Sequence, residues 1–235
     1  FGFSEGLGEL GNNDIGLLGN ANIESWKLSR HFFNSMFLPS FSERAYDVIN
    51  KLWNEMDSNW LSNYNNSKNE LEIDMTDWIR RFLASVIFEL NLGIKTSLIQ
   101  EDKEISYMHK KLISMLNMYM SSYGWFICNP YWMRHYVPFN RAHTKKLLEN
   151  RDDLFDFILK IISERRKEIE NSLISQDGKA EKMNDMLSMM IKSNTSLNTN
   201  NSTDDANSEL KRSMTDREIL GNVLDSLFGG IATVI

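Results

Sequence analysis

Two groups of residues in this sequence have the types and spacing to bind a ligand, and Trp26 with Arg30 is the first. They stand four residues apart, so on a helix they share one face, which Phe33 and Phe37 continue. An arginine stays charged, and burying it in such an apolar stripe costs several kcal/mol unless an anion accepts its donors. Arg30 is therefore expected to face a carboxylate or phosphate, of protein or ligand origin. The alternatives are a cation–π contact with Trp26 and a structural salt bridge.

The second group is the adjacent pair Gly229 and Gly230, followed by Thr233, inside a predicted helix. Each glycine weakens a helix interior by about 1 kcal/mol relative to alanine, so the pair indicates that something needs the space. One interpretation is a close helix crossing, where another backbone approaches. The other is a shelf beside a bound ligand or cofactor, with the Thr233 hydroxyl aimed at it.

The helix that carries the glycine pair has a clear beginning. Thr215 and Glu218 form a capping box, and Met214 can pack on Ile219 as a hydrophobic staple. Its last two turns are apolar on every side, which is typical of a helix in a protein interior. The usual signals of a helix end are missing: the last turn has no basic residue, and neither a terminating glycine nor a proline comes after it. The sequence therefore predicts an incomplete piece of a larger domain.

Composition limits the class of protein. A chain of 235 residues that is 42% hydrophobic and 25% charged is typical of a folded globular protein. The net charge of −6, with basic and acidic residues interleaved, argues against a nucleic-acid partner. A single cysteine excludes an internal disulfide and fits a reducing compartment. The sequence has no apolar run long enough to cross a membrane, and its first residues do not resemble a signal peptide.

Other residues that often carry chemistry are weaker candidates here. The four histidines lack paired ligand spacing, so a metal held by side chains of this chain is not expected. Cys128, among aromatic residues, is predicted to be a packed thiol. A group of methionines lies along one predicted apolar surface, which is either ordinary core or an adaptable wall for apolar ligands. These are Met108, Met115, Met118 and Met120.

The elements that would position these residues are predicted to be helices, in an all-α or mostly α domain over residues 1–235. The first twenty residues hold six of the twelve glycines and are predicted to be a loop. Apolar periodicity and capping signals predict the helices. They run from Asn22 to before Pro39, over 40–64, from Asp74 to Gly93, over 103–125, 141–172 and 185–191, and from Thr215 onward. An aromatic connector between Pro130 and Pro138 and a flexible polar loop over about 193–209 complete the prediction.

Taken together, the segment Trp26-Lys27-Leu28-Ser29-Arg30, the helix order and the ending Phe228 to Thr233 resemble the cytochrome P450 family, the haem-thiolate monooxygenases. In that family a WxxxR helix supplies its tryptophan and arginine to the haem propionates. The resemblance therefore implies that Trp26 and Arg30 bind haem, which would be the anion that Arg30 faces. Phe37 and the preceding loop Gly16-Leu17-Leu18-Gly19 are similar to the same region of the family.

The family also carries an Ala/Gly-Gly-x-Asp/Glu-Thr signature on the long helix over the distal haem face. Gly229, Gly230 and Thr233 match it, whereas Ala232 occupies the usual acid position. The resemblance implies that the glycines make room for dioxygen and that Thr233 assists its protonation. The missing acid puts the family's route of proton delivery in question, or routes it through water and Thr233.

By the same resemblance, Leu224 and Phe228 are expected to face the substrate. The fold would be a partial cytochrome P450 domain, truncated before the ExxR helix and the Cys-ligand segment, and inactive alone. The whole protein would use haem, accept electrons from NADPH-cytochrome P450 reductase or another redox partner, and hydroxylate an apolar substrate. An upstream anchor would place it on the cytosolic face of the endoplasmic reticulum membrane. The alternatives are a non-enzymatic helical scaffold and a related fold with peroxide-type or isomerase chemistry.

Overall fold

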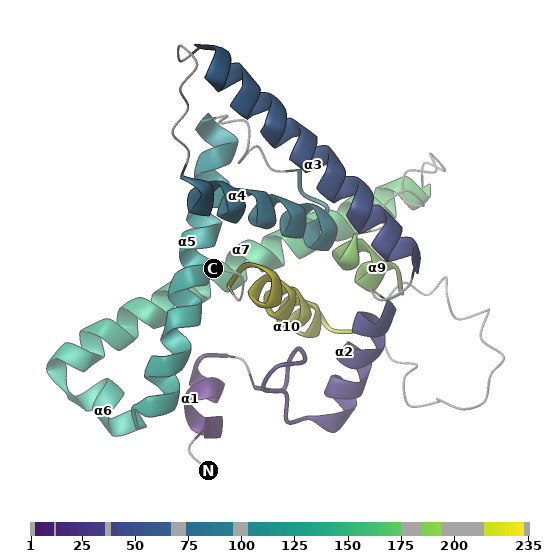
Figure 1. Cartoon of the computed structure of the whole chain (residues 1–235). Coiled ribbons are helices and arrows are strands. Elements are labelled where there is room, and N and C mark those ends of the chain that lie inside the picture. The colour runs from purple at the N-terminus through teal and green to yellow at the C-terminus, as the bar shows by residue number, and fades with distance from the viewer. Residues whose placement is uncertain are drawn as a thin grey trace.

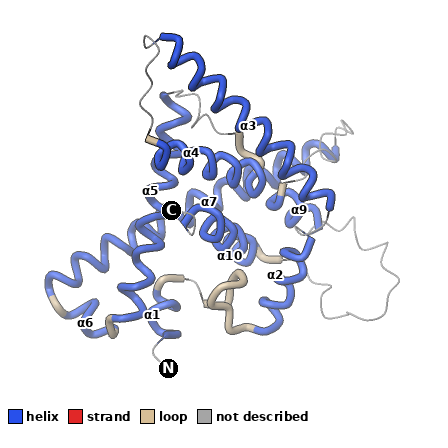
Figure 2. The backbone as a smooth tube through the Cα atoms, in the orientation of Figure 1, coloured by secondary structure: helices blue, strands red, loops and turns tan. Residues whose placement is uncertain are grey.

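The computed structural model of the chain describes residues 3–11, 13–35, 39–66, 74–95, 103–174, 185–193 and 214–232. Within these ranges the regular elements are all helices and no strand occurs (Figure 2), which confirms the prediction of a mostly α fold. None of the helices in the described part is both long and apolar enough to cross a bilayer.

The helices follow one another along the chain as Figure 1 labels them. They are α1 (Phe3–Glu9), α2 (Ile23–Ser35), α3 (Pro39–Asn66), α4 (Met75–Ile87) with its π-helical continuation η1 (Phe88–Leu92), α5 (Lys103–Cys128), α6 (Tyr131–Tyr136), α7 (Pro138–Ile174), α9 (Met186–Ser193) and α10 (Asp216–Leu227), which continues as the π-helical turn η4 (Phe228–Ala232). Each predicted helix is present, with its ends shifted by a few residues.

Two connecting segments contain helices that were not predicted, and for the first of them the predicted loop was wrong. The first twenty residues are not all loop, because Phe3–Glu9 forms α1. The aromatic connector between Pro130 and Pro138 is itself helical, as α6. Apart from Ser193, the last residue of α9, the polar loop predicted over 193–209 lies outside the described residues.

Capping groups explain where several helices begin and end. The Asn22 side chain accepts hydrogen bonds from the Glu24 and Ser25 amides, so it is the predicted N-cap of α2. Gly93, with a φ of 65°, ends the α4–η1 helix in a left-handed conformation that glycine adopts without strain. At the start of α10 the predicted capping box is confirmed, since Thr215 and Glu218 satisfy one another's backbone amides.

Helix α10 and its continuation η4 lie in the middle of the molecule (Figure 1): α2, α7, α9 and η1 contact α10, and α4 and α5 contact η4. Every residue from Glu218 to Asp225 is buried, as is Leu227. The main hydrophobic core joins α10 to buried side chains of α5, α7 and α9. Burial on all sides is what the apolar sequence of this helix predicts. The helix that carries Gly229 and Gly230 is therefore the central element of the fold.

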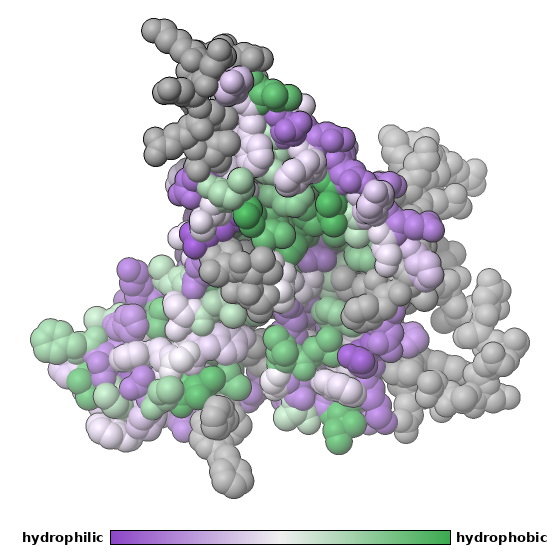
Figure 3. All heavy atoms as spheres, in the orientation of Figure 1, coloured by the Kyte–Doolittle hydropathy of each residue, from purple (hydrophilic) through white to green (hydrophobic). Residues whose placement is uncertain are grey.

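A smaller apolar cluster joins α3 to α4 on the opposite side of the core from α6. Val48, Leu52 and Met56 of α3 pack with Val86 of α4. Around them, aromatic rings meet edge to face, with centroids 5.7 Å apart for the pair Trp60 and Trp78. Figure 3 shows hydrophobic side chains at the surface in the angle between α3 and α4.

The most buried charged side chain in the described part of the chain is Arg134 of α6, only 1% exposed. Its Nη2 lies 2.6 Å from Oε2 of Glu9, the last residue of α1, and its Nε donates to the same oxygen. The guanidinium also donates to the Phe126 and Asn129 carbonyls and lies over the Phe126 ring. This pair fastens α1 and α6 to the end of α5.

Candidate functional site

Trp26 and Arg30 lie on α2 as predicted, but neither is buried. Trp26 is 40% exposed and the Arg30 side chain is exposed. Arg30 is therefore not the buried charge that the sequence led us to expect, and its role in facing an anion stays a prediction. Within the part of the chain that the structure describes, Arg30 forms neither an ion pair nor a cation–π contact with Trp26. Both side chains are exposed, and their four-residue spacing puts them on one face of α2.

The two adjacent glycines of η4 have different surroundings. A Cβ on Gly230 would collide with the Ile87 side chain of α4, including Cγ1 at 2.9 Å. Gly230 therefore serves a close helix crossing. At Gly229, which is exposed, a Cβ would meet no heavy atom of neighbouring elements within 4 Å. The close helix crossing is thus confirmed at Gly230, whereas the ligand shelf at Gly229 stays a prediction.

The backbone around these glycines is also distinctive. From Phe228 to Ala232 the helix widens from α-type to π-type hydrogen bonding. Such π-helical turns are rare and occur often at functional sites. Thr233 lies outside the described residues, and so does the side chain of Ala232.

The residues predicted to face substrate are buried in the fold. Leu224 is 0% exposed and belongs to the main core. Phe228 is 4% exposed and stacks on Tyr119 of α5, with ring centroids 5.4 Å apart and planes 15° apart. The Tyr119 hydroxyl donates a hydrogen bond to the Leu10 carbonyl. Burial is the main reason that the pKa of Tyr119 lies well above the usual value, and the neighbouring Tyr123 raises it further. Phe228 thus belongs to an aromatic group shared by α5 and η4.

Asp225 is a buried carboxylate that the sequence reasoning did not single out. It is 6% exposed, and its Oδ2 accepts hydrogen bonds from the backbone amides of Leu17 and Leu18, the latter at 3.0 Å. Its other oxygen is buried and has no hydrogen-bond partner among the described residues. Burial raises the pKa of Asp225 from 3.8 to about 6, although the two amide donors act in the opposite direction. A carboxylate in the middle of a buried helix was the signal that could have identified it.

Two further predictions concern sulfur-containing residues. Met115 is buried in the core, and Met118 and Met120 pack against it; the side chain of Met108 is outside the described part. The prediction of a packed thiol at Cys128 was wrong, because this residue is exposed at the C-terminal end of α5. Within the described ranges no three histidine, cysteine or acidic side chains gather to hold a metal ion.

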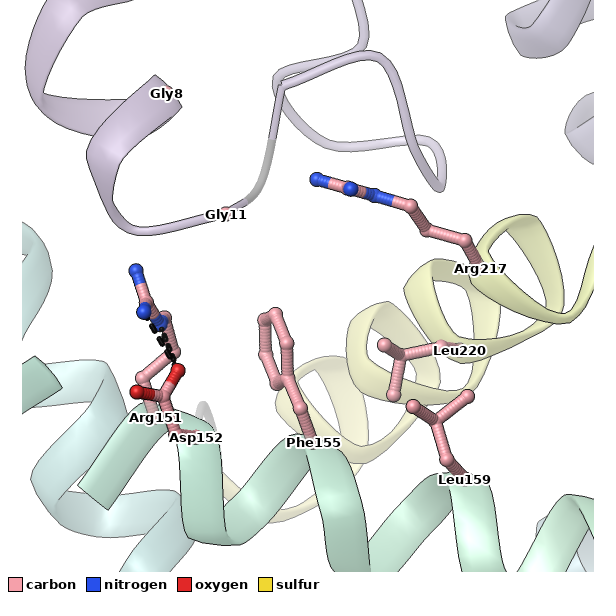
Figure 4. Close-up of a pocket in the computed structure, with 8 residues that line it drawn as sticks. All are labelled: Gly8, Gly11, Arg151, Asp152, Phe155, Leu159, Arg217 and Leu220. Atoms are coloured by element: carbon pink, nitrogen blue, oxygen red, sulfur yellow. Dashed lines mark hydrogen bonds and ion pairs between the residues drawn. The ribbon is translucent and has the colours of Figure 1, made fainter. Parts of the chain in front are cut away.

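A separate hollow of about 370 Å³ lies between α7, the start of α10 and the segment after α1 (Figure 4). Phe155 and Leu159 of α7 and Leu220 of α10 form its apolar floor, and Arg151 and Arg217 stand at its sides. Arg151 is already paired with Asp152, and neither Gly229 nor any other predicted site residue lines this hollow.

The fold and these residues define a class of protein. A helical domain with a Trp-x-x-x-Arg motif on α2 and a Gly-Gly pair at the end of a buried central helix resembles the haem-thiolate monooxygenases. The sequence pattern of the family described as Cytochrome P450 matches residues 9–235, and the chain belongs to that family. No curated protein matches the chain significantly. Membership implies a haem cofactor and a monooxygenase type of function.

Proposed function

We propose that this chain forms the distal side of a haem monooxygenase that hydroxylates an apolar organic substrate. In this proposal Trp26 and Arg30 hold the haem propionates, and Gly229 leaves room above the macrocycle for dioxygen. The residues suit such a group, because an exposed guanidinium and an indole N–H are the donors that a pair of carboxylates on a flat apolar molecule requires.

The observation that carries the proposal is the exposure of Gly229. Helix α10 is buried from Glu218 to Asp225 and at Leu227, and its continuation η4 is exposed at Gly229, in a π-helical turn. A Cβ there would meet no neighbouring element within 4 Å among the described residues. Since glycine costs helix stability, an exposed helical glycine beside open space is best explained by a ligand that needs the position empty.

Each residue would have a limited task in the reaction. The haem, when bound, supplies the redox chemistry that activates dioxygen and inserts one oxygen atom into the substrate. Arg30 would neutralise and orient the propionate edge, and Trp26 would donate its indole N–H to it. Thr233 would hold or pass a proton during oxygen activation, with water in place of the acid that Ala232 replaces. Phe228 would shape the apolar wall over the substrate, and Leu224 would support that wall from the core.

Further parts of the proposal concern the whole protein. The only cysteine in these 235 residues, Cys128, does not lie in a segment like the one that carries the family's thiolate ligand, so these residues alone are expected to be inactive. Electrons would come from NADPH-cytochrome P450 reductase or a similar redox partner. By analogy with eukaryotic members of the family, the protein would act on the cytosolic face of the endoplasmic reticulum membrane.

The test is haem binding by the full-length protein, compared with two arginine variants. The reduced carbon monoxide complex of the parent should give a thiolate-type Soret band. Arg30→Leu should lose haem about tenfold faster or more, because it removes a charged hydrogen-bond donor from the propionates. Arg80→Leu, which removes an exposed arginine of α4, should match the parent. A parent without bound haem, or equal haem loss from the two variants, would overturn the proposal.

A further inference from the structure

The segment from Asp14 to Asn20, which precedes α2, packs directly against the backbone of α10. A Cβ on Gly221 of α10 would lie 2.7 Å from the Gly16 nitrogen and 2.8 Å from the Ile15 Cβ. On the other side, Gly16 has a φ of 72°, and a Cβ there would lie 3.0 Å from the Gly221 carbonyl oxygen. The two segments of the chain therefore touch through glycines, and a side chain at either position would separate them.

Asp225 holds this segment in place. It lies one helical turn after Gly221, and its Oδ2 accepts the amide protons of both Leu17 and Leu18. These bonds join residues more than two hundred positions apart. A buried carboxylate that accepts two backbone amides makes stronger hydrogen bonds than neutral acceptors do.

The same segment is continuous with the start of α2. The Asn20 amide group donates to the Gly16 carbonyl at 2.9 Å and to the Ser25 hydroxyl at 3.1 Å. Ser25 in turn donates to the Asp14 carbonyl at 3.2 Å. Ser25 directly precedes Trp26, so these bonds make the segment and the first turn of α2 one unit.

Asp225 also shares a helix face with Gly229, since the two are four residues apart. The carboxylate thus lies one turn from Gly229, which is proposed to face the haem. It also forms hydrogen bonds with the segment that leads into Trp26. Burial raises the pKa of Asp225 to about 6, so the ionised group costs folding free energy. Asp225 is thus unfavourable for the core and yet connects two distant segments of the chain. Such a buried group is typical of a functional site.

We propose that Asp225 is a positioning residue of the haem site: by holding the Leu17 and Leu18 amides, it fixes the Trp26–Arg30 face of α2 relative to Gly229. The inference rests on the proposed function, because it assigns the two sides of the site to one cofactor. Asp225 itself does not touch the reacting atoms in this role. Its contribution is the distance between the propionate anchors and the distal helix.

The experiment uses the full-length protein with Asp225→Ala, Gly16→Ala and, as a control, Asp216→Ala. Gly16→Ala keeps the carboxylate but separates the segment from α10, so it tests the same connection from the other partner. Asp216 is an exposed carboxylate of the same helix that pairs with Arg166. Hydrogen–deuterium exchange of peptides covering 15–20 reports on this connection, and transfer of haem to apomyoglobin reports on the site.

For both Asp225→Ala and Gly16→Ala we expect exchange at Leu17 and Leu18 to rise about tenfold or more. Haem loss should accelerate by roughly 2- to 30-fold, the range for coupling through one connection. Asp216→Ala should leave both unchanged. Unchanged exchange in the two test variants would overturn the connection, and faster exchange with unchanged haem loss would overturn the positioning role. A parent that binds no haem would instead overturn the proposed function, while the exchange data still decide whether Asp225 holds the segment.

Discussion

Replacing Asp225 with asparagine should stabilise the fold at neutral pH, although it weakens the grip on Leu17 and Leu18. Burial raises the pKa of this carboxyl from 3.8 to about 6. The folded protein therefore binds the Asp225 proton more tightly than the unfolded chain does. At roughly 1.4 kcal/mol per pH unit, the rise corresponds to about 3 kcal/mol of unfolding free energy. Asparagine resembles the protonated form and avoids this cost.

The sign of the pH dependence follows from the raised pKa. The favourable contribution of protonated Asp225 is fully present below about pH 4 and is lost as the pH rises through about 6. The advantage of Asp225→Asn over the parent should thus grow with pH, by about 1.4 kcal/mol between pH 5 and pH 8. Tyr119, the titratable group of α5 that faces Asp225, remains neutral throughout because burial raises its pKa.

Urea denaturation of both proteins at several pH values measures this difference, since other titrating groups are common to the pair and cancel. Asp216→Asn is the matched control. It removes an exposed carboxylate from the first turn of α10 and with it the ion pair to Arg166. The free energy of unfolding should therefore fall by about 0.5 to 1 kcal/mol. The reasoning is refuted if Asp225→Asn differs from the parent by the same amount at pH 5 and pH 8.

Two other predictions concern packing and a buried charge, both measured by urea denaturation. Gly230→Ala should destabilise the fold by about 1 to 3 kcal/mol, because its Cβ would strike Ile87. Gly229→Ala meets no neighbour and should stabilise by up to about 1 kcal/mol, so equal effects of the two variants would contradict the difference between the glycines. Glu9→Ala should cost about 3 kcal/mol, since it leaves the Arg134 charge buried without its carboxylate. A loss below about 0.5 kcal/mol would show that Arg134 is satisfied by backbone carbonyls alone.

Helices were predictable from this sequence because periodicity and capping are local signals. The capping box at Thr215 and the left-handed end at Gly93 are both visible within a few residues of sequence. Glycine is a more ambiguous signal. Gly6 suggested a loop, but it lies in α1, where a Cβ would run into the Phe126 backbone of α5. A glycine allows either a turn or a close approach, and only the partner, here 120 residues away, decides between them.

For charged residues, too, the local sequence does not show which distant segment covers or contacts them. The rule that a buried arginine needs an anion was applied to Arg30, which is exposed; the structure obeys it at Arg134, which binds Glu9. Neighbouring apolar residues do not reveal which face of α2 is covered, because covering depends on segments distant in sequence. Asp225 is the converse case, since its partners are amides of Leu17 and Leu18, which leave no mark on composition or spacing. A polar residue in a helix that is otherwise apolar all round is therefore the signal to follow, because its burial has to be compensated by a contact that the local sequence does not contain.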